Sequence, residues 1–334
     1  MVNVFCDFHH GALYYSFALL FEKRLGWELF RPIGYEWHKR GFWAYSHNPR
    51  VVKQYLEPFG ERFRDGVYHV PREEGTVEYV QKAITFEKFL EMDFDFAIAS
   101  VNQHEIPFSK LVKQHKPSAV LIRQLGNPLE VCDFNVCQNI LNSTTHPVPP
   151  HVNCVNYHPE FSLEDYSYAP PATNRVIKNF VNCLPKTVDA PLWYEYKDAL
   201  PEFTFKMHGI LGTDGLLPNR EVPATMKEAA FIWHLKSQGD GYGFVVHQAS
   251  ALGRPCIVKK SYYAGQLAEV LFDDSVTCID LDLGTRDENF KKIRVSSEPD
   301  NHAKLCENAY RVFKENVDFD REFEEIKSFL ERAS

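Results

Sequence analysis

Short apolar runs alternate with longer amphipathic stretches along most of the chain. In the first half, this pattern predicts helices at residues 13–25 and 105–115. It predicts strands at residues 3–8, 27–32, 95–100, 118–125, 140–144 and 152–157. Such alternation is typical of parallel sheets whose two faces are covered by helices. The first half is therefore expected to form one doubly wound α/β domain.

A second alternation follows the stretch "EDYSYAPPATNR", whose prolines and small residues interrupt the pattern and indicate a linker. Helices are expected at residues 243–252 and 265–271, and the charged, periodic tail at residues 301–333 is expected to be helical to its end. The expected strands are residues 176–183, 203–208, 230–235, 255–258 and 277–280. Two Rossmann-like domains in tandem are predicted to face each other across a cleft, with ligands bound at the carboxyl ends of the strands.

Composition narrows the possible classes of function. A chain of 334 residues with a formal net charge of -8 has no general attraction for nucleic acid or anionic lipid. No apolar run is long enough to cross a membrane, and the start "MVNVFCDFHH" lacks the features of a signal peptide, so we expect a cytoplasmic protein without membrane insertion. The eight scattered cysteines form no C-x-x-C pair, which favours reduced thiols over a disulfide framework or a zinc site.

The most informative segment is "GDGYGFVVHQASALGRPCIV", residues 239–258. Three glycines within five residues allow a ligand to approach the backbone, and the following helix begins with amide groups and the positive end of its dipole. A diphosphate is the natural ligand of such a turn. On glycine content alone, a tight strand-to-helix turn without a ligand explains the segment equally well.

This segment resembles the donor-binding motif of retaining glycosyltransferases with the two-domain GT-B fold, in the family of glycogen synthases, sucrose synthases and bacterial mannosyltransferases. The family motif is written around "E-G-F-G-L-V-x-x-E-A-x-A-x-G-x-P-V", and this chain reads "D-G-Y-G-F-V-V-H-Q-A-S-A-L-G-R-P-C" in the same register. The two acidic positions of the motif are occupied by Asp240 and Gln248. Gln248 is neutral but can still hydrogen-bond a ribose diol.

The resemblance implies roles for individual residues of the second half. Asp240 would contact hydroxyls of the donor sugar, and Gln248 would hold the nucleotide ribose. Lys186 would neutralise the donor diphosphate, although the Arg that usually accompanies it in the family is not evident. His208, after the strand "FTFKMHG", is a further donor-side candidate that fits a core or rim histidine equally well. The backbone amides around the donor phosphates would come from Gly241, Gly243, Phe244 and Val245.

In the first half, the loop "VNQHEIPF" is similar to the family's "H-x-H" loop, with His104 at the second histidine and Asn102 at the first. The opening motif "VFCDFHHGALYY" places His9, His10 and Gly11 after the first predicted strand. Gly11 and the helix start after it resemble the turn that faces the donor phosphate or the acceptor in these enzymes. A retaining reaction makes His104 the leading catalytic candidate, whereas an inverting reaction would transfer that role to His9 or His10.

Other chemistries lack the residues they need. Adjacent residues on an extended chain point to opposite faces, so His9 and His10 are not expected to bind one ion together with Asp7, and no metal site is predicted. No G-x-S-x-G motif is present for a serine hydrolase, and the first strand-helix turn offers only Gly11 toward a dinucleotide fingerprint. The acidic residues do not suggest a glycosidase pair.

The sequence therefore predicts an acceptor-side domain at residues 1–172 and a nucleotide-sugar domain at residues 173–315. The resemblance implies that a last helix at residues 316–334 packs back on the first domain. It also implies a hexosyltransferase that uses a UDP- or GDP-sugar and no further cofactor. A GT-B-like binding protein without activity, and a glucosyltransferase acting on hydroxymethylated bases in phage DNA, remain as alternatives. The net charge is unfavourable for an enzyme that acts on DNA. A basic strip is nevertheless compatible with DNA binding; it consists of His38, Lys39, Arg40, Arg50 and Lys53.

Overall fold

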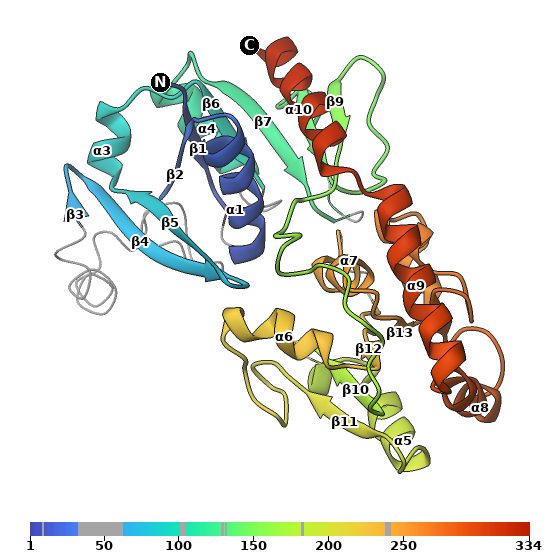
Figure 1. Ribbon diagram of the computed structural model, residues 1–334. Coiled ribbons are helices and arrows are strands. Elements are labelled where there is room, and N and C mark those ends of the chain that lie inside the picture. The colour runs from blue at the N-terminus through green and yellow to red at the C-terminus, as the bar shows by residue number, and fades with distance from the viewer. Residues whose placement is uncertain are drawn as a thin grey trace. The chain divides into compact units, whose positions relative to one another are not determined.

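The computed structural model describes residues 1–8, 10–32, 63–100, 105–127, 130, 132–181, 184–237 and 242–334. The chain divides into two compact units. Unit 1 contains Met1–Phe161 and Phe319–Ser334, and unit 2 contains Ser162–Asp318. Each unit has its own sheet, and the C-terminal helix belongs to unit 1 (Figure 1).

The sheet of unit 1 has nine strands within the described residues, in the order β3-β4-β5-β2-β1-β6-β7-β8-β9. The strands from β2 to β9 in this order are all parallel to one another. Their bounds are β1 Asn3–Cys6, β2 Glu28–Pro32, β3 Phe63–Arg64, β4 Val67–Glu74, β5 Val77–Ile84, β6 Phe96–Ala99, β7 Val120–Leu125, β8 Asn139–Asn142 and β9 Asn153–Asn156. With β1 inside the sheet and later strands added on both sides of it, unit 1 is doubly wound.

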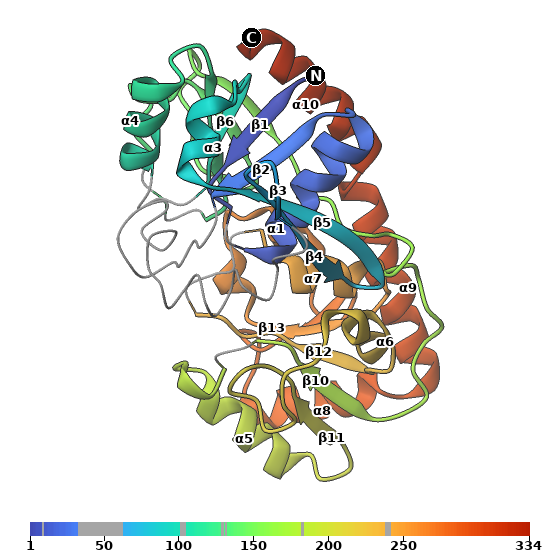
Figure 2. The same ribbon diagram turned by 90° about the vertical axis from the view of Figure 1, so that its left-hand side faces the viewer.

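Helices cover both faces of this sheet because successive strand residues point to opposite sides. Val4 and Cys6 of β1 pack in one core with residues of α1 (Gly11–Ala18) and α10 (Phe319–Ala333). Phe5 packs in a second core with residues of α3 (Phe86–Glu91) and α4 (Glu105–His115). The grouping of α3 with α4, apart from α1 and α10, can be followed in Figure 2.

Several features of unit 1 differ from the sequence prediction, and neither β3 nor α3 was predicted. The hairpin of β4 and β5, which pair antiparallel across Gly75 and Thr76, was not predicted. The predicted helix at residues 13–25 is α1 followed by a wider π-helical segment at Leu19–Arg24. The hairpin extends the parallel sheet at the β2 edge, where β5 pairs parallel with β2.

Unit 2 has a parallel sheet of five strands within the described residues, in the order β11-β10-β12-β13-β14. The strands are β10 Val176–Asn179, β11 Thr204–Met207, β12 Phe231–Trp233, β13 Cys256–Val258 and β14 Cys278–Asp280. All five coincide with predicted strands, which are longer by one to four residues. Helix α5 (Ala190–Ala199) covers the sheet through Trp193 and Tyr196, whose rings lie 5.6 and 5.1 Å from that of Trp233.

The remaining helices of unit 2 are α6 Val222–Lys227, α7 Phe244–Ala251, α8 Arg286–Ser296 and α9 Pro299–Asn316, with 3-10 turns at Leu184–Lys186, Asn219–Glu221, Lys260–Tyr263 and Leu267–Leu271. The tail is helical as predicted, but its helix ends at Asn316 and a new one begins at Phe319. This break coincides with the return of the chain to unit 1. None of the helices seen in the described ranges is both long and apolar enough to span a bilayer.

Candidate functional site

The carboxyl ends of the unit 2 strands lie at one edge of the sheet because all five strands are parallel. His208 follows β11, and the 3-10 turn that ends at Lys186 follows β10. The loop after β12 leads to Gly243 and α7. Three segments that carry predicted donor-side residues therefore start from neighbouring strands at the same edge.

Gly243 forms the turn that begins α7. Its backbone is in the left-handed region, with φ 75° and ψ 59°, where glycine alone is free of strain. The Gly243 carbonyl accepts hydrogen bonds from the amides of Val246 and His247, at 3.1 and 3.2 Å, and His247 Nδ1 lies 3.0 Å from the same oxygen. The sequence prediction that a glycine-dependent turn opens this helix is confirmed.

The first turn of α7 has the features of an anion site. No side chain caps it within the described residues, and the N-terminal amides carry the positive end of the helix dipole. The ring of buried Tyr242 stacks on the ring of His247 at 4.1 Å and fixes the approach to the turn. Phe244 and Val245 are half-buried at its opening, and Gln248 is buried one turn further on. Asp240 and Gly241 lie outside the described residues.

His208 lies at the same edge with both ring nitrogens buried. Neither nitrogen makes a hydrogen bond within the part of the chain that the structure describes. The ring packs on Phe180, with centroids 5.6 Å apart. Burial disfavours the charged ring and lowers the pKa of His208 despite the opposing effect of Asp214, so the imidazole is neutral near pH 7. A neutral imidazole can donate one hydrogen bond and accept another.

Lys186 is exposed at the end of its 3-10 turn. A few residues later, buried Asp189 accepts hydrogen bonds from Lys259 Nζ at 3.2 Å and from the Tyr262 hydroxyl at 2.8 Å. Lys259 follows β13, and β12 lies between β10 and β13 in the sheet. The segment that carries Lys186 therefore crosses the end of β12, the strand from which the glycine turn departs. Burial alone would lower the pKa of Lys259, but its bonds to Tyr262 and Asp189 raise it.

The sequence did not single out Asp189, Lys259 or Tyr262. Asp189 stands in "KTVDAP" and the other two in "VKKSYYAG", and neither stretch has a spacing that predicts contact. The only local signal is that both stretches directly follow elements at the carboxyl edge. Their contact depends on which strands are neighbours in the folded sheet.

In unit 1, the predicted catalytic residues His9 and His104 lie outside the described residues. His10 is exposed at the residue before α1, and Gly11 is the first residue of that helix. The Gly11 carbonyl accepts a hydrogen bond of 3.5 Å from the Tyr79 hydroxyl. The proposed roles of these histidines therefore stay predictions.

The carboxyl edge of the unit 1 sheet instead joins polar residues that the sequence analysis left without a role. The Asp7 carboxylate, after β1, accepts hydrogen bonds from the Ser100 amide at 2.6 Å and hydroxyl at 2.9 Å, after β6. Arg123 of β7 is fully buried and donates to the Ala99 carbonyl and to Glu130, both at 3.2 Å. A charged residue within an apolar strand, as in "VLIRQL", is the sequence signal that could have indicated this cluster.

No group of three or more histidine, cysteine or acidic side chains suited to a metal ion occurs among the described residues. The seven cysteines within these ranges are free thiols. What unit 2 offers at its carboxyl edge is therefore a set of amides, a lysine, a neutral histidine and an amide side chain. Such groups can bind a phosphate-containing ligand without a metal.

No family model and no curated protein matches the chain, whereas several solved structures match it over nearly its whole length. Anabaena HepE, solved with UDP and glucose, is 14% identical with a TM-score of 0.67, and the match covers 99% of this chain and 100% of HepE. A glycosyltransferase from Rickettsia africae is 10% identical, with a TM-score of 0.65 and coverage of 99% and 98%. An α-glucosyltransferase solved with UDP and a 13-mer DNA containing an HMU base is 12% identical, with a TM-score of 0.57 and coverage of 98% of both chains.

These likenesses, together with the two parallel sheets, show that the chain has the GT-B fold of two Rossmann-like units. The predicted fold class is confirmed, as is the predicted resemblance to GT-B glycosyltransferases at the level of the fold. At 10 to 14% identity, the likeness carries no information about individual residues.

Proposed function

We propose that the chain is a nucleotide-sugar-dependent glycosyltransferase that moves a hexose from a UDP- or GDP-sugar to an acceptor hydroxyl. The observation that carries this proposal is the left-handed turn at Gly243, which opens α7 at the carboxyl edge of the unit 2 sheet. The comparisons support it because HepE was solved with UDP-glucose and the matched α-glucosyltransferase with UDP. No cofactor other than the donor is needed.

The diphosphate of the donor would bind at the first turn of α7, where amide dipoles stabilise negative charge. Gln248 would reach the ribose from one turn further on. Lys186 would add a fixed positive charge, and neutral His208 would hydrogen-bond the donor. Asp240 and Gly241 would meet the sugar, as the motif resemblance implies.

In the reaction, the bond between the anomeric carbon and the phosphate oxygen breaks, and the nucleoside diphosphate leaves with the bonding electrons. The acceptor oxygen forms a new bond to the anomeric carbon and loses its proton to the leaving phosphate or to a base. Negative charge grows on the diphosphate as the bond breaks, so groups that stabilise this charge accelerate the step.

The stereochemical outcome decides which histidine is catalytic. Retention at the anomeric carbon, which the motif resemblance favours, makes His104 the catalytic candidate, close to the reacting carbon of the donor sugar. Inversion would assign the base to His9 or His10. Proton NMR of the first product formed distinguishes the two outcomes, since the two anomers have different coupling constants.

Calorimetric titration with UDP and GDP tests the donor site through Gly243→Ala. A side chain in the left-handed region costs about 1–2 kcal/mol, and a Cβ at this turn would also obstruct the approach of the diphosphate. We expect nucleotide binding to be lost. Gly26→Ala is the matched control, because Gly26 also has a positive φ, of 70°, nothing lies within 4 Å of an added Cβ, and it lies before β2, away from the carboxyl edge.

Equal nucleotide affinity in the two glycine variants would contradict the donor site. Binding without release of free sugar or transfer to any acceptor would instead support the alternative of a GT-B binding protein. Incubation with a panel of nucleotide sugars, followed by detection of free sugar, separates these outcomes.

A DNA base is the second candidate acceptor, because one of the matched proteins was solved with DNA. The net charge of -8 is unfavourable for DNA, and the basic strip found in the sequence lies outside the described residues. We therefore propose a hydroxyl of a glycan or small molecule as the acceptor. Salt-dependent retention on DNA, together with transfer to a hydroxymethylated base, would overturn this choice.

A further inference from the structure

Strand β9 is the last strand of the unit 1 sheet, and it pairs only with β8 within the described residues. The amides of Asn153 and Tyr157 donate to carbonyls of Gln138 and Asn142 on the β8 side. Because backbone groups of a strand alternate in direction, those of Cys154 and Asn156 point away from β8. No hydrogen bond joins these two amides and two carbonyls to another described residue.

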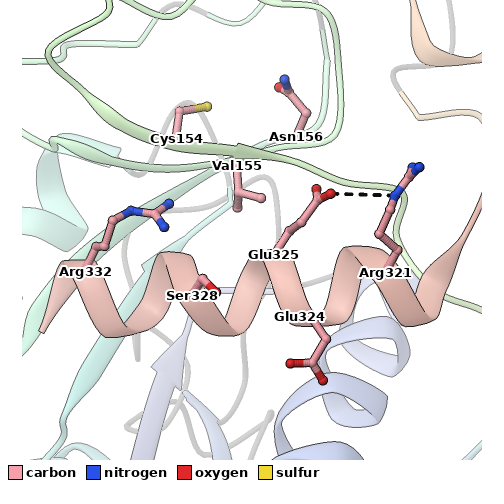
Figure 3. A pocket seen from close by; sticks show the side chains of 8 residues that line it. All are labelled: Cys154, Val155, Asn156, Arg321, Glu324, Glu325, Ser328 and Arg332. Carbon is pink, nitrogen blue, oxygen red and sulfur yellow. Dashed lines mark ion pairs between the residues drawn. The ribbon is translucent and has the colours of Figure 1, made fainter.

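Helix α10 runs beside this open edge and forms a groove with it. The groove has a volume of about 620 Å³, and its walls are residues 154–156 of β9 and the polar face of α10, including Arg321, Glu325, Ser328 and Arg332 (Figure 3). We call it the edge groove. Natural sheets protect an open edge with a short strand, charged residues, proline or a bulge, or with a covering helix or loop. Strand β9 has only four residues and α10 lies beside it, but its side chains Cys154, Val155 and Asn156 include no charged residue and no proline.

The charges of the edge groove are ordered along its length. Helix α10 runs antiparallel to β9, since Arg332 donates to the Asn153 side chain while Glu322 accepts from the His158 amide. Arg332 therefore lies at the beginning of β9 and Arg321 toward its end, as Figure 3 shows. Glu325 lies between them, with about half of its side chain exposed, 3.6 Å from Arg321.

A second copy of this chain is a poor match for the edge groove. Antiparallel pairing of two β9 strands around a two-fold axis at Val155 would place Arg332 of each copy beside Arg321 of the other. It would also bring the two Glu325 carboxylates toward each other. Like charges placed opposite each other destabilise strand pairing.

We propose that the edge groove binds an extended segment of a partner protein, which pairs antiparallel with β9 and carries a lysine or arginine opposite Val155. Antiparallel pairing gives slightly more stability per residue than parallel pairing and would use all four outward backbone groups of Cys154 and Asn156. A partner residue opposite Val155 has its side chain on the same face of the sheet as Val155. That face is the one covered by α10, so a basic side chain there would reach Glu325.

The test uses a short synthetic peptide of alternating threonine and valine with one central lysine, and a matched peptide with a central glutamate. Binding is followed by fluorescence anisotropy, and protection of the Cys154 and Asn156 amides from hydrogen exchange is followed by NMR. We expect protection of both amides by the lysine peptide and weaker binding of the glutamate peptide.

Two variants of Cys154 distinguish the contribution of its backbone amide to peptide binding from that of its side chain. Cys154→Pro removes an outward donor while leaving the ladder to β8 intact, whereas Cys154→Ala keeps the donor. Loss of one hydrogen bond of about 0.5–1.5 kcal/mol predicts a roughly two- to tenfold weaker affinity for the proline variant alone. Glu325→Lys is expected to reverse the preference between the two peptides, and it tests the proposal even if Cys154→Pro does not fold, because position 325 is exposed.

Equal binding of both peptides, or equal affinity in folded Cys154→Pro and Cys154→Ala, would overturn the proposal. A dimer in light scattering that becomes a monomer in Cys154→Pro would also overturn it, because the occupant would then be a second copy. Failure of the donor-site experiments leaves this proposal unaffected, since the edge groove lies in unit 1 and the donor site in unit 2.

Discussion

The carboxyl edges of the two sheets use their polar residues in different ways. In unit 1, Asp7 is bonded to Ser100, and Arg123 is bonded to the Ala99 carbonyl and to Glu130. In unit 2, both ring nitrogens of His208 and the side-chain oxygen of Asn179 are buried without a hydrogen bond among the described residues.

A buried polar group without a partner costs about 1–3 kcal/mol, so such groups are rare unless a ligand or water satisfies them. At the edge of unit 1, the charged groups bond to one another and to the backbone, whereas at the edge of unit 2 neither ring nitrogen of His208 makes a hydrogen bond among the described residues. The comparison indicates that the number of polar residues at a sheet edge does not identify the binding site. The residues whose hydrogen bonds remain to be made are the better indication.

The largest expected effect comes from breaking the unit 1 cluster. Arg123→Ala removes the buried guanidinium that bonds Glu130 and the Ala99 carbonyl, and removal of one member of a buried ion pair costs about 3–5 kcal/mol. The free energy of unfolding, measured by urea denaturation, should fall by this amount, while nucleotide affinity of the folded fraction stays unchanged.

Arg294→Ala is the control for this prediction, because Arg294 pairs with Glu202 at the surface. Exposed ion pairs contribute about 0–1 kcal/mol. Equal destabilisation by the two substitutions would mean that the unit 1 cluster is not the stabilising element described above.

At His208, a substitution is expected to change nucleotide affinity more than stability. His208→Phe removes two ring nitrogens that have no partner and keeps the ring contact with Phe180. The free energy of unfolding should change by less than about 1 kcal/mol, because the lost polar atoms made no hydrogen bond in the protein. Affinity for UDP or GDP should fall roughly three- to tenfold if the ring hydrogen-bonds the nucleotide. Strong destabilisation with unchanged affinity would reverse the comparison between the two edges.

The smallest effect concerns pH. Burial holds the pKa of His208 below its usual 6.5, so the unfolded chain binds this proton more readily than the folded chain. His208 therefore reduces stability as the pH falls below about 6.5, and it has no such effect above that value. His208→Phe should show a flatter dependence of unfolding free energy on pH between 7.5 and 5 than the wild-type protein. Superimposable slopes would contradict a neutral, buried His208.

Most of the strands of both units could be predicted from the sequence, because a short apolar run between polar stretches is a local signal. The hairpin of β4 and β5 could not, since polar residues such as Arg72, Glu73 and Gln81 interrupt the apolar runs of both strands. The turn between the two strands is at Gly75 and Thr76. Gly75 is the one residue there that indicates a turn, and a single glycine is weak evidence for a hairpin. Helices α3, α5, α6 and α8 were missed as well. Of these, α3 and α6 have six residues each, which is too few to show a helical period.

The candidate site was predicted in part. Gly243 could be assigned from sequence because a left-handed turn before a helix requires glycine whatever surrounds it. Gln248 was assigned from the motif resemblance; it lies on α7 beyond that turn, and its role stays a prediction. Asp189 and Lys259 could not be found in this way, because they are 70 positions apart and meet only across the end of β12.

The sequence by itself determined the alternation of strands and helices, the division into two α/β halves and the glycine turn, since each depends on interactions within a few residues. Only the tertiary structure decided which polar residues meet at the strand ends, such as Asp7 and Ser100, which are 93 positions apart. It also decided that β9 is the last strand of the sheet within the described residues, where the outward backbone groups of Cys154 and Asn156 bond no other described residue. The physical reason is that these contacts depend on strand order and on the packing of helices, which no local periodicity encodes.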